Sequence, residues 1–546
     1  MNLLRSLKKS ILDLIQKEFS LTDAQLKPIQ VTLNVDKVGF GDLAINAALI
    51  LAKILDKSPI EIAKQLKKKI KPLAPEIETI EIAGPGFLNI TLTKETWQNI
   101  AHELSNDKNF FKLDESVPRK KYSVEFVSAN PTGPLHLGHG RGGIIGDVLA
   151  NVLNFLGHKA DKEYYINDAG NQIQKLGNSL KIRCQQELGQ QVDFPDDGYA
   201  GDYLVDLAKK CIEHYGKKVI EENIEFFTTF AKEQLLELIK KTLDSYGVTF
   251  DRWFSETPLH KSGAVERAIE LLKEKELAYT KDDALWFCSS KFGDDKDRVL
   301  QKADGLFTYI AADIAYHQDK FERGYDQLID ILGQDHHGYV KRLKATMKAI
   351  GYDDEKLHVI LYQLVSITRD KQAVRMSKRT GKFEKLSDVI EQVGVDVARF
   401  FYLNRKADAH LEFDMDVALK KTEENPVYYI QYAYVRTNSL LTKAKEDKIA
   451  PATKITALEA PEIKVLKKIC SLETILRSIE STYQTHMLAY YTLELAKTFH
   501  AYYANNKIID LENLETSQSR LALVKLLNQT FALCLDLLGL SKPERM

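Results

Sequence analysis

A buried strand that runs into a Pro- and Gly-rich loop and then a helix is the most constraining feature of this chain. KYSVEFVSA at 121–129 predicts the strand, NPTGPLHLGHG at 130–140 the loop, and IIGDVLANVLNFLG at 144–157 the helix. A further strand is expected at 159–168. This order is the βαβ unit of a parallel sheet covered by helices. Ligands bind beyond the carboxyl ends of such strands, so we expect the loop Ser128–Gly140 at the ligand-binding edge.

Composition and periodicity divide the 546 residues into three regions. A chain of this length holds two to four domains, because single cores rarely exceed about 250–300 residues. Residues 1–115 predict an α+β module, with two strands in 77–92 joined by a Gly-Pro-Gly turn. Residues 116–415 predict a Rossmann-type parallel-sheet core with a helical insertion near 180–250. Residues 416–546 are nearly free of Gly and Pro, which predicts an α-helical bundle.

Charge and cysteine content give weaker constraints. The chain has 76 Lys and Arg against 77 Asp and Glu, so its global charge indicates no nucleic-acid partner. That argument is weak, because a large enzyme can carry a local basic face. The five cysteines are far apart with no CxxC pair, which indicates neither a zinc site nor a disulfide framework. Scattered free thiols fit a reducing cytosol.

The sequence also predicts where the protein resides. The first 19 residues include basic ones, but their apolar positions recur at helical spacing and no cleavage site follows. We expect no segment to reach the ~20 apolar residues of a membrane span. The chain is therefore expected to be cytoplasmic, without membrane contact.

Two histidines at the start of the predicted helix suggest a phosphate site. His136, Gly138 and His139 would bring two imidazoles and the first helix amides to one small volume. Imidazole N–H groups donate to phosphate oxygens, the helix terminus adds partial positive charge, and glycine permits close approach. The alternative is a pair of surface histidines, which the strand–loop–helix context disfavours. Metal binding is a poorer explanation, because the sequence suggests no third ligand.

A second cationic loop lies far downstream. RMSKR at 375–379 is followed by TGK at 380–382. Such a loop suits a mobile clamp on a polyphosphate, where it would neutralise charge on leaving pyrophosphate. Alone, a basic loop is usually solvated surface.

Together the two patterns resemble the HIGH and KMSKS motifs of class I aminoacyl-tRNA synthetases. The first differs by Leu137 for Ile, and the second has Arg375 and Arg379 at its outer positions. The longer run SANPTGPLHLGH at 128–139 resembles the extended signature of arginyl-tRNA synthetases. Further segments that resemble this family are YIAAD at 309–313, GQDH at 333–336, DVAR at 396–399 and PERM at 543–546. The resemblance covers essentially the whole chain, including its domain order.

The resemblance implies an arginine pocket, and the residue types suit a guanidinium. A planar cation is best held by carboxylates with paired acceptors. Tyr309 and Asp313 are four apart, so on a helix they share one face; Glu125 lies in an otherwise apolar strand. The alternatives are an ordinary amphipathic helix and a solvent-facing strand residue. The implied arginine-binding residues are Glu125, Ser128, Ala129, Asn130, Tyr309, Asp313 and Gln334. Glu125 and Asp313 would hold the guanidinium, and Asn130 the α-amino and carboxylate end.

The resemblance also implies where ATP binds. The implied ATP-binding residues are Pro134, His136, Gly138, His139, Gln334, Asp335, Met376, Ser377 and Lys378. Of these, His136, His139 and Lys378 would be the catalytic residues that hold the transition state. ATP is expected to arrive with Mg²⁺, and neither a resident metal nor zinc is expected. Asp335 and the paired His336 and His337 are the alternative candidates for metal ligands, ranked lower because no further ligands cluster there.

A tRNA contact is implied in the bundle. The family places anticodon contacts at positions that match Tyr429, Tyr432, Arg436 and Met546. Aromatic rings and guanidinium planes are platforms for unstacked RNA bases. The alternative is that the tyrosines form part of the bundle core. The N-terminal module resembles the family's extra domain, which touches the outer corner of the tRNA.

The implied reaction has two steps. The arginine carboxylate attacks the α-phosphate of ATP, and the terminal adenosine of tRNA(Arg) then attacks the adenylate through its 2′-hydroxyl. Positioning and phosphate-charge stabilisation carry both steps. In this family, activation generally requires bound tRNA, and a monomer is expected. The alternatives are another enzyme of the superfamily, such as a zinc-dependent cysteinyl-tRNA synthetase, and a non-catalytic RNA-binding paralogue.

Overall fold

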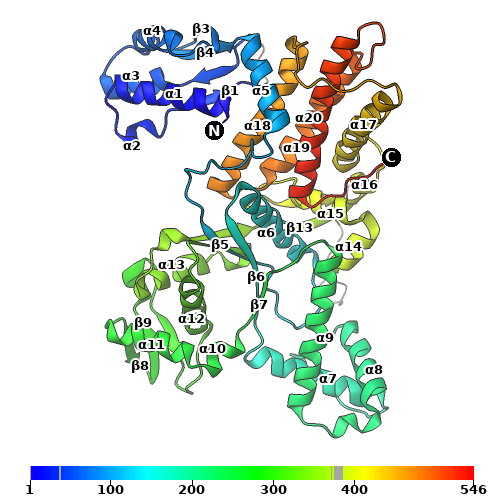
Figure 1. The fold of residues 1–546 in the computed structure, drawn as a ribbon. Helices are drawn as coiled ribbons and strands as arrows, with labels where there is room; N and C mark the ends of the chain where they lie inside the picture. Colours follow the sequence, from blue (N-terminus) through cyan, green and yellow to red (C-terminus); the bar gives the residue numbers. More distant parts are fainter. Residues whose placement is uncertain (1, 36–38, 371, 374–384) are drawn as a thin grey trace.

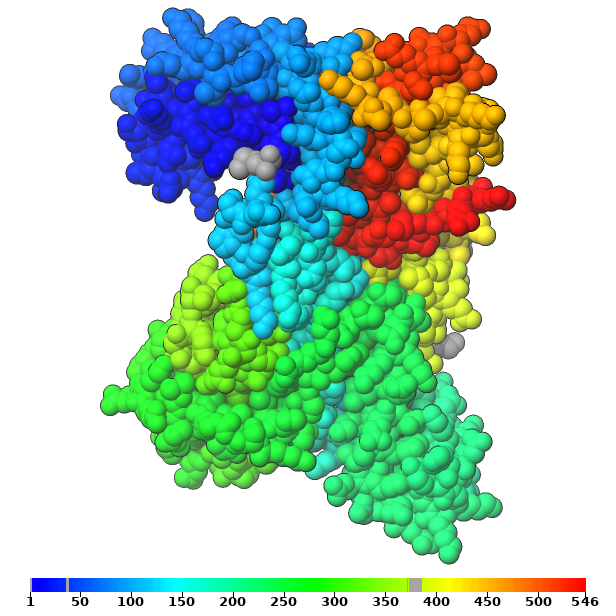
Figure 2. All heavy atoms as spheres, viewed as in Figure 1, coloured from blue at the N-terminus to red at the C-terminus, as the bar shows by residue number. Residues whose placement is uncertain are grey.

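The structure, a computed structural model, describes residues 2–35, 39–370, 372–373 and 385–546. In Figure 1 an N-terminal module and a helical bundle lie side by side above a parallel-sheet core. Two lobes extend from the core, one formed by residues 171–245 and the other by residues 257–322 together with 339–350, and the space-filling view in Figure 2 shows them as separate projections. The predicted fold class is confirmed: a Rossmann-type core with a helical insertion, an α+β N-terminal module and a C-terminal helical bundle.

The N-terminal module is an antiparallel sheet covered by helices. Its strands are β1 Val31–Leu33, β2 Leu43–Ile45, β3 Ile77–Ala83 and β4 Phe87–Leu92, in the order β1-β2-β4-β3. Its helices are α1 Leu3–Glu18, α2 Asp23–Leu26, α3 Ala47–Leu55, α4 Pro59–Ile70 and α5 Lys94–Asn106. β3 and β4 form the predicted hairpin, with Ala83 opposite Phe87. Leu7, Ile11 and Ile15 recur every four residues along α1 and are buried, so this amphipathic face anchors the helix.

Five parallel strands form the core sheet, in the order β12-β11-β5-β6-β7. They are β5 Lys121–Phe126, β6 Lys159–Ile166, β7 Arg252–Ser255, β11 Gln327–Gly333 and β12 Leu357–Tyr362. From β5 the chain moves outward to β7 and then returns to place β11 on the other side of β5. Ligands bind at the carboxyl ends of the strands that flank such a reversal. The loops after β5 and β11 both lie at this point.

The helix after the first loop, α6 (Leu137–Leu156), packs closely on the sheet because glycines face it. Nearly all of its residues are buried. A side chain at Gly142 would collide with Tyr362, and one at Gly146 would collide with Phe126. Each helical glycine costs roughly 0.5–1 kcal/mol relative to alanine. That cost is offset here by close contact, which fixes the start of α6 at the edge of the sheet.

Two segments interrupt the sheet. The first is the predicted helical insertion, α7 Asn171–Glu187, α8 Asp202–Tyr215 and α9 Ile224–Ser245, which has its own apolar core. The second lies between β7 and β11 and contains α10 Thr257–Lys261, α11 Ala264–Glu274, β8 Ala278–Lys281, β9 Ala284–Phe287, β10 Arg298–Gln301 and α12 Tyr309–Glu322. Helix α13 Tyr339–Ile350 follows β11. Strands β8 to β10 form a small antiparallel sheet, and α12 follows it.

A buried arginine joins the core to the bundle. The intervening elements are β13 Val365–Arg369, β14 Gln372–Ala373, α14 Leu386–Val393, α15 Val395–Tyr402, β15 Leu411–Asp414 and α16 Met415–Ala418. Arg399 of α15 is fully buried and pairs with Asp147 of α6 at 2.5 Å. The same guanidinium donates to Leu538 O at 2.9 Å and to Tyr246 O at 3.0 Å. One side chain therefore connects α6, the end of α9 and the last bundle helix.

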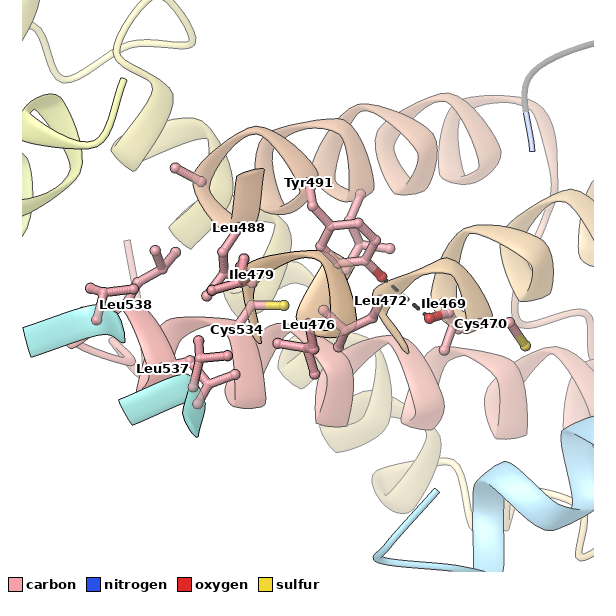
Figure 3. Close-up of a cluster of buried hydrophobic side chains, with 14 of the residues drawn as sticks. Ile469, Cys470, Leu472, Leu476, Ile479, Leu488, Tyr491, Cys534, Leu537 and Leu538 are labelled. Carbon is pink, nitrogen blue, oxygen red and sulfur yellow. Dashed lines mark hydrogen bonds between the residues drawn. The ribbon is translucent and has the colours of Figure 1, made fainter. Parts of the chain in front are cut away.

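The bundle consists of four long helices, α17 Pro426–Glu446, α18 Ala460–Thr482, α19 His486–Asn505 and α20 Leu514–Leu538. Figure 3 shows Leu472, Leu488 and Cys534, from three different helices, in one buried cluster. Tyr491 lies in the same cluster, and Figure 3 draws the hydrogen bond that its hydroxyl donates to Ile469 O at 3.4 Å. Buried side chains from three helices thus share one core.

Helix α20 corrects one expectation. It is long and apolar enough, by length and composition, to cross a membrane, whereas no such segment was expected. In the structure 67% of its most apolar window is buried. Its partners are the other bundle helices and α6, so its apolarity is explained by a central place in the core.

Candidate active site

The loop after β5 begins in a strained conformation. Val127 and Ser128 have φ angles of 68° and 39°, a region that β-branched residues above all avoid. Ser128 Oγ donates to Glu125 Oε1 at 3.0 Å and accepts from the Tyr165 amide at 3.1 Å. These bonds hold a turn that the backbone would not adopt alone.

Three buried carboxylates stand in register across three neighbouring strands. Glu125 of β5 lies opposite Asp330 of β11 on one side and Glu163 of β6 on the other. Residues in register on adjacent strands point to the same face of the sheet. Like charges this close raise one another's pKa unless cations or proton donors lie nearby. We refer to these three residues as the carboxylate row.

Helix α12 supplies the partners of the carboxylate row. Lys320 Nζ lies 2.5 Å from Glu125 Oε2 and 2.9 Å from Asp330 Oδ1, and it is fully buried. The Tyr316 hydroxyl lies 2.9 Å from Glu125 Oε2 and 2.6 Å from Glu163 Oε1. Tyr316 and Lys320 are one helical turn apart, so both reach the sheet from the same face.

The two ends of the row have additional partners. Arg323 forms a bidentate pair with Glu163, at 2.6 and 2.9 Å, and His317 Nε2 lies 2.9 Å from Asp330 Oδ2. Burial alone would raise the pKa of Glu163, but Arg323 and Lys320 hold it below its usual value. Lys320 and His317 likewise outweigh burial and lower the pKa of Asp330. The row is therefore a charged network neutralised from within the protein.

Asp313, one turn before His317 on α12, differs from the row. Its carboxylate forms no ion pair with any residue in the described part of the chain. Burial, together with the charges of Glu125 and Glu256, raises its pKa to about 7 against an opposing effect of His317. A ligand that brings one buried positive charge would return this pKa towards its normal range.

Two side chains of this pocket were missed by sequence reasoning. Tyr165 lies at the carboxyl end of β6, and buried Glu256 follows β7. Burial, then the charges of Glu256 and Asp313, raise the pKa of Tyr165, which also hydrogen-bonds with Glu256. The polar end of the predicted strand at 159–168 was a usable signal for Tyr165. Glu256 had none, because β7 is only four residues long and carries no clear pattern.

The other implied arginine residues lie around this pocket. Tyr309 is the first residue of α12 and is 64% exposed, so its ring stands at the rim, one turn from half-buried Asp313. Ala129 O accepts a hydrogen bond from the Tyr164 hydroxyl at 2.7 Å, which anchors the loop. The Asn130 amide donates to Gln172 of α7 at 2.8 Å.

The two histidines pack against each other at the start of α6. Their ring centroids are 3.6 Å apart with 20° between the planes. His136 Nδ1 accepts from the Gly138 amide at 3.0 Å, and His139 Nδ1 accepts from the His136 amide at 3.2 Å. Accepting at Nδ1 assigns the ring proton to Nε2 in both residues. Burial, and then His136, lowers the pKa of His139 to about 3, so this ring is a neutral N–H donor.

The remaining nucleotide candidates are less enclosed. Pro134 is half-buried in the first loop, and half-buried Gln334 and exposed Asp335 begin the short helix after β11. His336 lies 3.8 Å from Asp335, and both are largely exposed. No group of three His, Cys, Asp or Glu suited to a metal occurs among the described residues. Met376, Ser377 and Lys378 lie outside the described residues.

The implied tRNA residues lie on α17 and at the chain end. Arg436 holds its guanidinium 4.3 Å from the Tyr432 ring and 4.6 Å from the Tyr503 ring. Tyr432 is 37% exposed, whereas Tyr429 is half-buried with its ring 4.5 Å from His500. Met546 is 45% exposed. The structure thus combines an exposed cation–aromatic surface with a tyrosine that partly belongs to the bundle packing.

Comparison with known proteins first defines the class. Residues 99–412 match the family model described as the class I tRNA synthetase (R) catalytic domain. Methionyl-tRNA synthetase of Mycobacterium tuberculosis shares the fold at a TM-score of 0.57 and 11% identity, covering 77% of this chain and 92% of that one. The parallel sheet, its reversal point and the loop with two histidines are those of a class I tRNA synthetase.

Further matches define the family within that class. Residues 5–92 match the arginyl tRNA synthetase N-terminal domain, and residues 430–546 match the DALR anticodon binding domain. An arginine–tRNA ligase of Halalkalibacterium halodurans is 44% identical over 93% of this chain and 92% of its own length. One of Bacillus cereus is 40% identical over 99% and 98%. The chain belongs to the arginyl-tRNA synthetase family.

Solved structures agree. A putative arginyl-tRNA synthetase of Campylobacter jejuni has a TM-score of 0.77 at 37% identity, covering 83% of this chain and all of that one. Arginyl-tRNA synthetase of Thermus thermophilus has the same TM-score at 23% identity over the full length of both chains, which supports the fold. The predicted family is confirmed.

Proposed function

We propose that this chain is an arginine–tRNA ligase that forms arginyl-adenylate from L-arginine and ATP and transfers arginine to tRNA(Arg). The observation that carries the proposal is the cluster of acidic side chains between α12 and the sheet. Its carboxylate row is already paired with Lys320, His317 and Arg323, and beside the row lies Asp313, which forms no ion pair with a described residue. A guanidinium supplies the permanent, planar charge that this pocket needs.

In the proposed complex, the guanidinium pairs with Asp313 and with Glu256. Glu256 replaces Glu125, the partner expected from the sequence, because Glu125 already accepts hydrogen bonds from Lys320 and Tyr316. Glu125 forms the floor of the pocket, where Lys320, Tyr316 and Ser128 fix its orientation. Tyr309 closes over the side chain from the rim. Asn130 and Gln334 hold the α-amino and carboxylate end. Because the floor is held before arginine arrives, little reorganisation opposes binding.

Activation requires the arginine carboxylate to attack the α-phosphate of ATP while pyrophosphate leaves. His136 and His139 hydrogen-bond to phosphate oxygens through Nε2, and the first amides of α6 add their partial positive charge. Neutral donors suit this task, because they lose no proton to the phosphate. ATP arrives with Mg²⁺, which shields the phosphates. Lys378, with Met376 and Ser377, would hold the leaving pyrophosphate.

Transfer requires the tRNA to reach from the bundle to the sheet. Tyr429, Tyr432, Arg436 and Met546 are proposed to hold the anticodon, and the N-terminal module the outer corner. The terminal 2′-hydroxyl attacks the mixed anhydride and releases AMP. The domain limits proposed from the sequence are 1–115, 116–415 and 416–546. The enzyme is proposed to act in the cytoplasm as a monomer, without zinc.

The test is arginine-dependent ATP–pyrophosphate exchange by the purified chain, with and without tRNA(Arg), against a panel of amino acids. Exchange that is confined to arginine supports the pocket assignment, and a requirement for tRNA supports coupled activation. Absence of exchange from a folded protein in every condition would favour the alternative, an RNA-binding paralogue without catalysis.

A further inference from the structure

Two contacts connect the helical insertion with the loop that carries the proposed arginine and ATP residues. Asn130 Nδ2 donates to Oε1 of Gln172, in the first turn of α7, at 2.8 Å. The Tyr203 hydroxyl, from α8, donates to Thr132 O at 2.6 Å, and its ring lies beside Gly133. The insertion therefore constrains one side-chain amide and one backbone carbonyl of this loop.

The two contacts constrain different things. The Tyr203 bond fixes the path of the backbone at Thr132. In this arrangement the Gln172 oxygen accepts from Nδ2, and this bond sets which way the Asn130 amide faces. While Nδ2 donates to Gln172, Oδ1 points to the opposite side. In the described part of the chain Asn130 Oδ1 accepts no hydrogen bond.

The α-ammonium group of an amino acid can only donate hydrogen bonds, so it must meet an oxygen and would be repelled by an NH₂ group. We infer that Gln172 is a positioning residue that holds the Asn130 amide with its oxygen towards the α-ammonium of arginine. This inference rests on the proposed function and deepens it, since it assigns recognition of the amino end to the insertion. Gln172 does not touch arginine; it acts through Asn130.

The inference makes a prediction about ligand chemistry. Without an acceptor at position 172 the Asn130 amide can rotate. In a fraction of the protein molecules the Asn130 NH₂ group then faces the ligand in place of the oxygen. Ligands that carry the amino group should then bind more weakly. A ligand that lacks the amino group but keeps the guanidinium and the carboxylate should bind as before.

The test compares three variants and three ligands. Gln172→Met keeps nearly the same side-chain length and removes the acceptor, and Gln172→Glu keeps an acceptor at both oxygens. Tyr203→Phe removes the backbone anchor alone. The ligands are arginine, agmatine, which lacks the carboxylate, and 5-guanidinopentanoate, which lacks the amino group. The measured quantities are the KM for arginine in tRNA-supported exchange and the Ki of each analogue.

We expect Gln172→Met to raise the KM for arginine and the Ki of agmatine about twofold, because a freely rotating amide presents its oxygen in about half of the molecules. The Ki of 5-guanidinopentanoate should equal that of wild type in the same measurement. Gln172→Glu should leave all three values unchanged, which also shows that position 172 tolerates substitution. Tyr203→Phe should weaken all three ligands by a similar factor, because it loosens the backbone without changing the amide.

Equal losses for the three ligands in Gln172→Met would overturn the inference, because they would indicate a general packing role. Wild-type values in that variant would overturn it as well. If wild-type protein itself shows no arginine-dependent exchange, the proposed function fails and the inference fails with it. The two failures are therefore distinguishable.

Discussion

The two ends of the proposed site handle charge in opposite ways. At the arginine end, buried carboxylates from three strands are paired with Lys320 and Arg323, whereas Asp313 of α12 forms no ion pair with a described residue. At the nucleotide end, His136 and His139 offer N–H groups at a helix start, and His139 is neutral. A cationic substrate therefore meets a carboxylate whose negative charge has no ion-pair partner, and an anionic substrate meets neutral N–H dipoles. The comparison indicates that the protein places ionised carboxylates where the ligand carries a permanent positive charge.

The largest effect should come from removing Lys320, the cation that pairs with Glu125 and Asp330. Lys320→Met leaves Glu125 buried without a cation and Asp330 with His317 alone, which should destabilise the sheet by about 4 kcal/mol. Hydrogen exchange of the β5 and β11 amides reports this as easier local opening. The control is Lys273→Met, which breaks an exposed pair on α11 and should change stability by less than about 1 kcal/mol. Unchanged protection in Lys320→Met would show that the row needs no internal cation.

The next largest effect is expected from removing the negative charge of Asp313 while its size and position are kept. Asp313→Asn keeps the shape but removes the charge that a guanidinium requires, so kcat/KM for arginine should fall about 300-fold. Arginine-dependent exchange measures it. The control is Asp319→Asn on the same helix, which faces Arg323 and should stay within about twofold. Normal arginine kinetics in Asp313→Asn would remove this residue from the pocket.

A smaller effect is expected at the nucleotide end. His139→Ala removes one neutral donor and should lower kcat about 100-fold, with the KM for arginine unchanged. Single-turnover adenylate formation separates this from product release. If the KM for arginine rose instead and kcat stayed constant, the division of the site into two ends would be wrong.

The smallest effect is a difference in pH dependence between the ends. Because the pKa of Asp313 is raised to about 7 in the free pocket, its ionised fraction falls as pH drops through 7. Arginine needs the ionised form, so its KM should rise about threefold between pH 7.5 and pH 6.5. His139, with a pKa of about 3, stays neutral over that range. An arginine KM that is flat from pH 6 to 8 would contradict the raised pKa.

The local elements of the site could be predicted from the sequence. The strand, loop and helix at 121–157 were identifiable because hydrophobic periodicity and Pro-Gly punctuation are local signals. Tyr309 and Asp313 on one helical face followed from a spacing of four. The hairpin at β3 and β4 followed from its Gly-Pro-Gly turn.

The long-range part of the site could not be predicted. Asp330 and Glu125 are 205 positions apart, and their pairing depends on a strand register that a single sequence does not specify. Lys320 was unremarkable as one lysine among many, until the fold buried it against both carboxylates. Gln172 likewise gained its contact from the way α7 docks on the loop.

The buried guanidinium of Arg399 has a mechanical consequence. Leu538, which accepts its hydrogen bond, is the last residue of α20, and Asp147, its ion-pair partner, lies in α6. At 1.5 Å per residue the 25 residues of α20 form a rod of about 37 Å. Arg399 pins one end of that rod to the helix that begins at the two histidines. If α20 tilted away from α6, the Arg399 guanidinium would lose its hydrogen bonds to Leu538 O or to Asp147. These contacts therefore resist a change in the angle between the two helices.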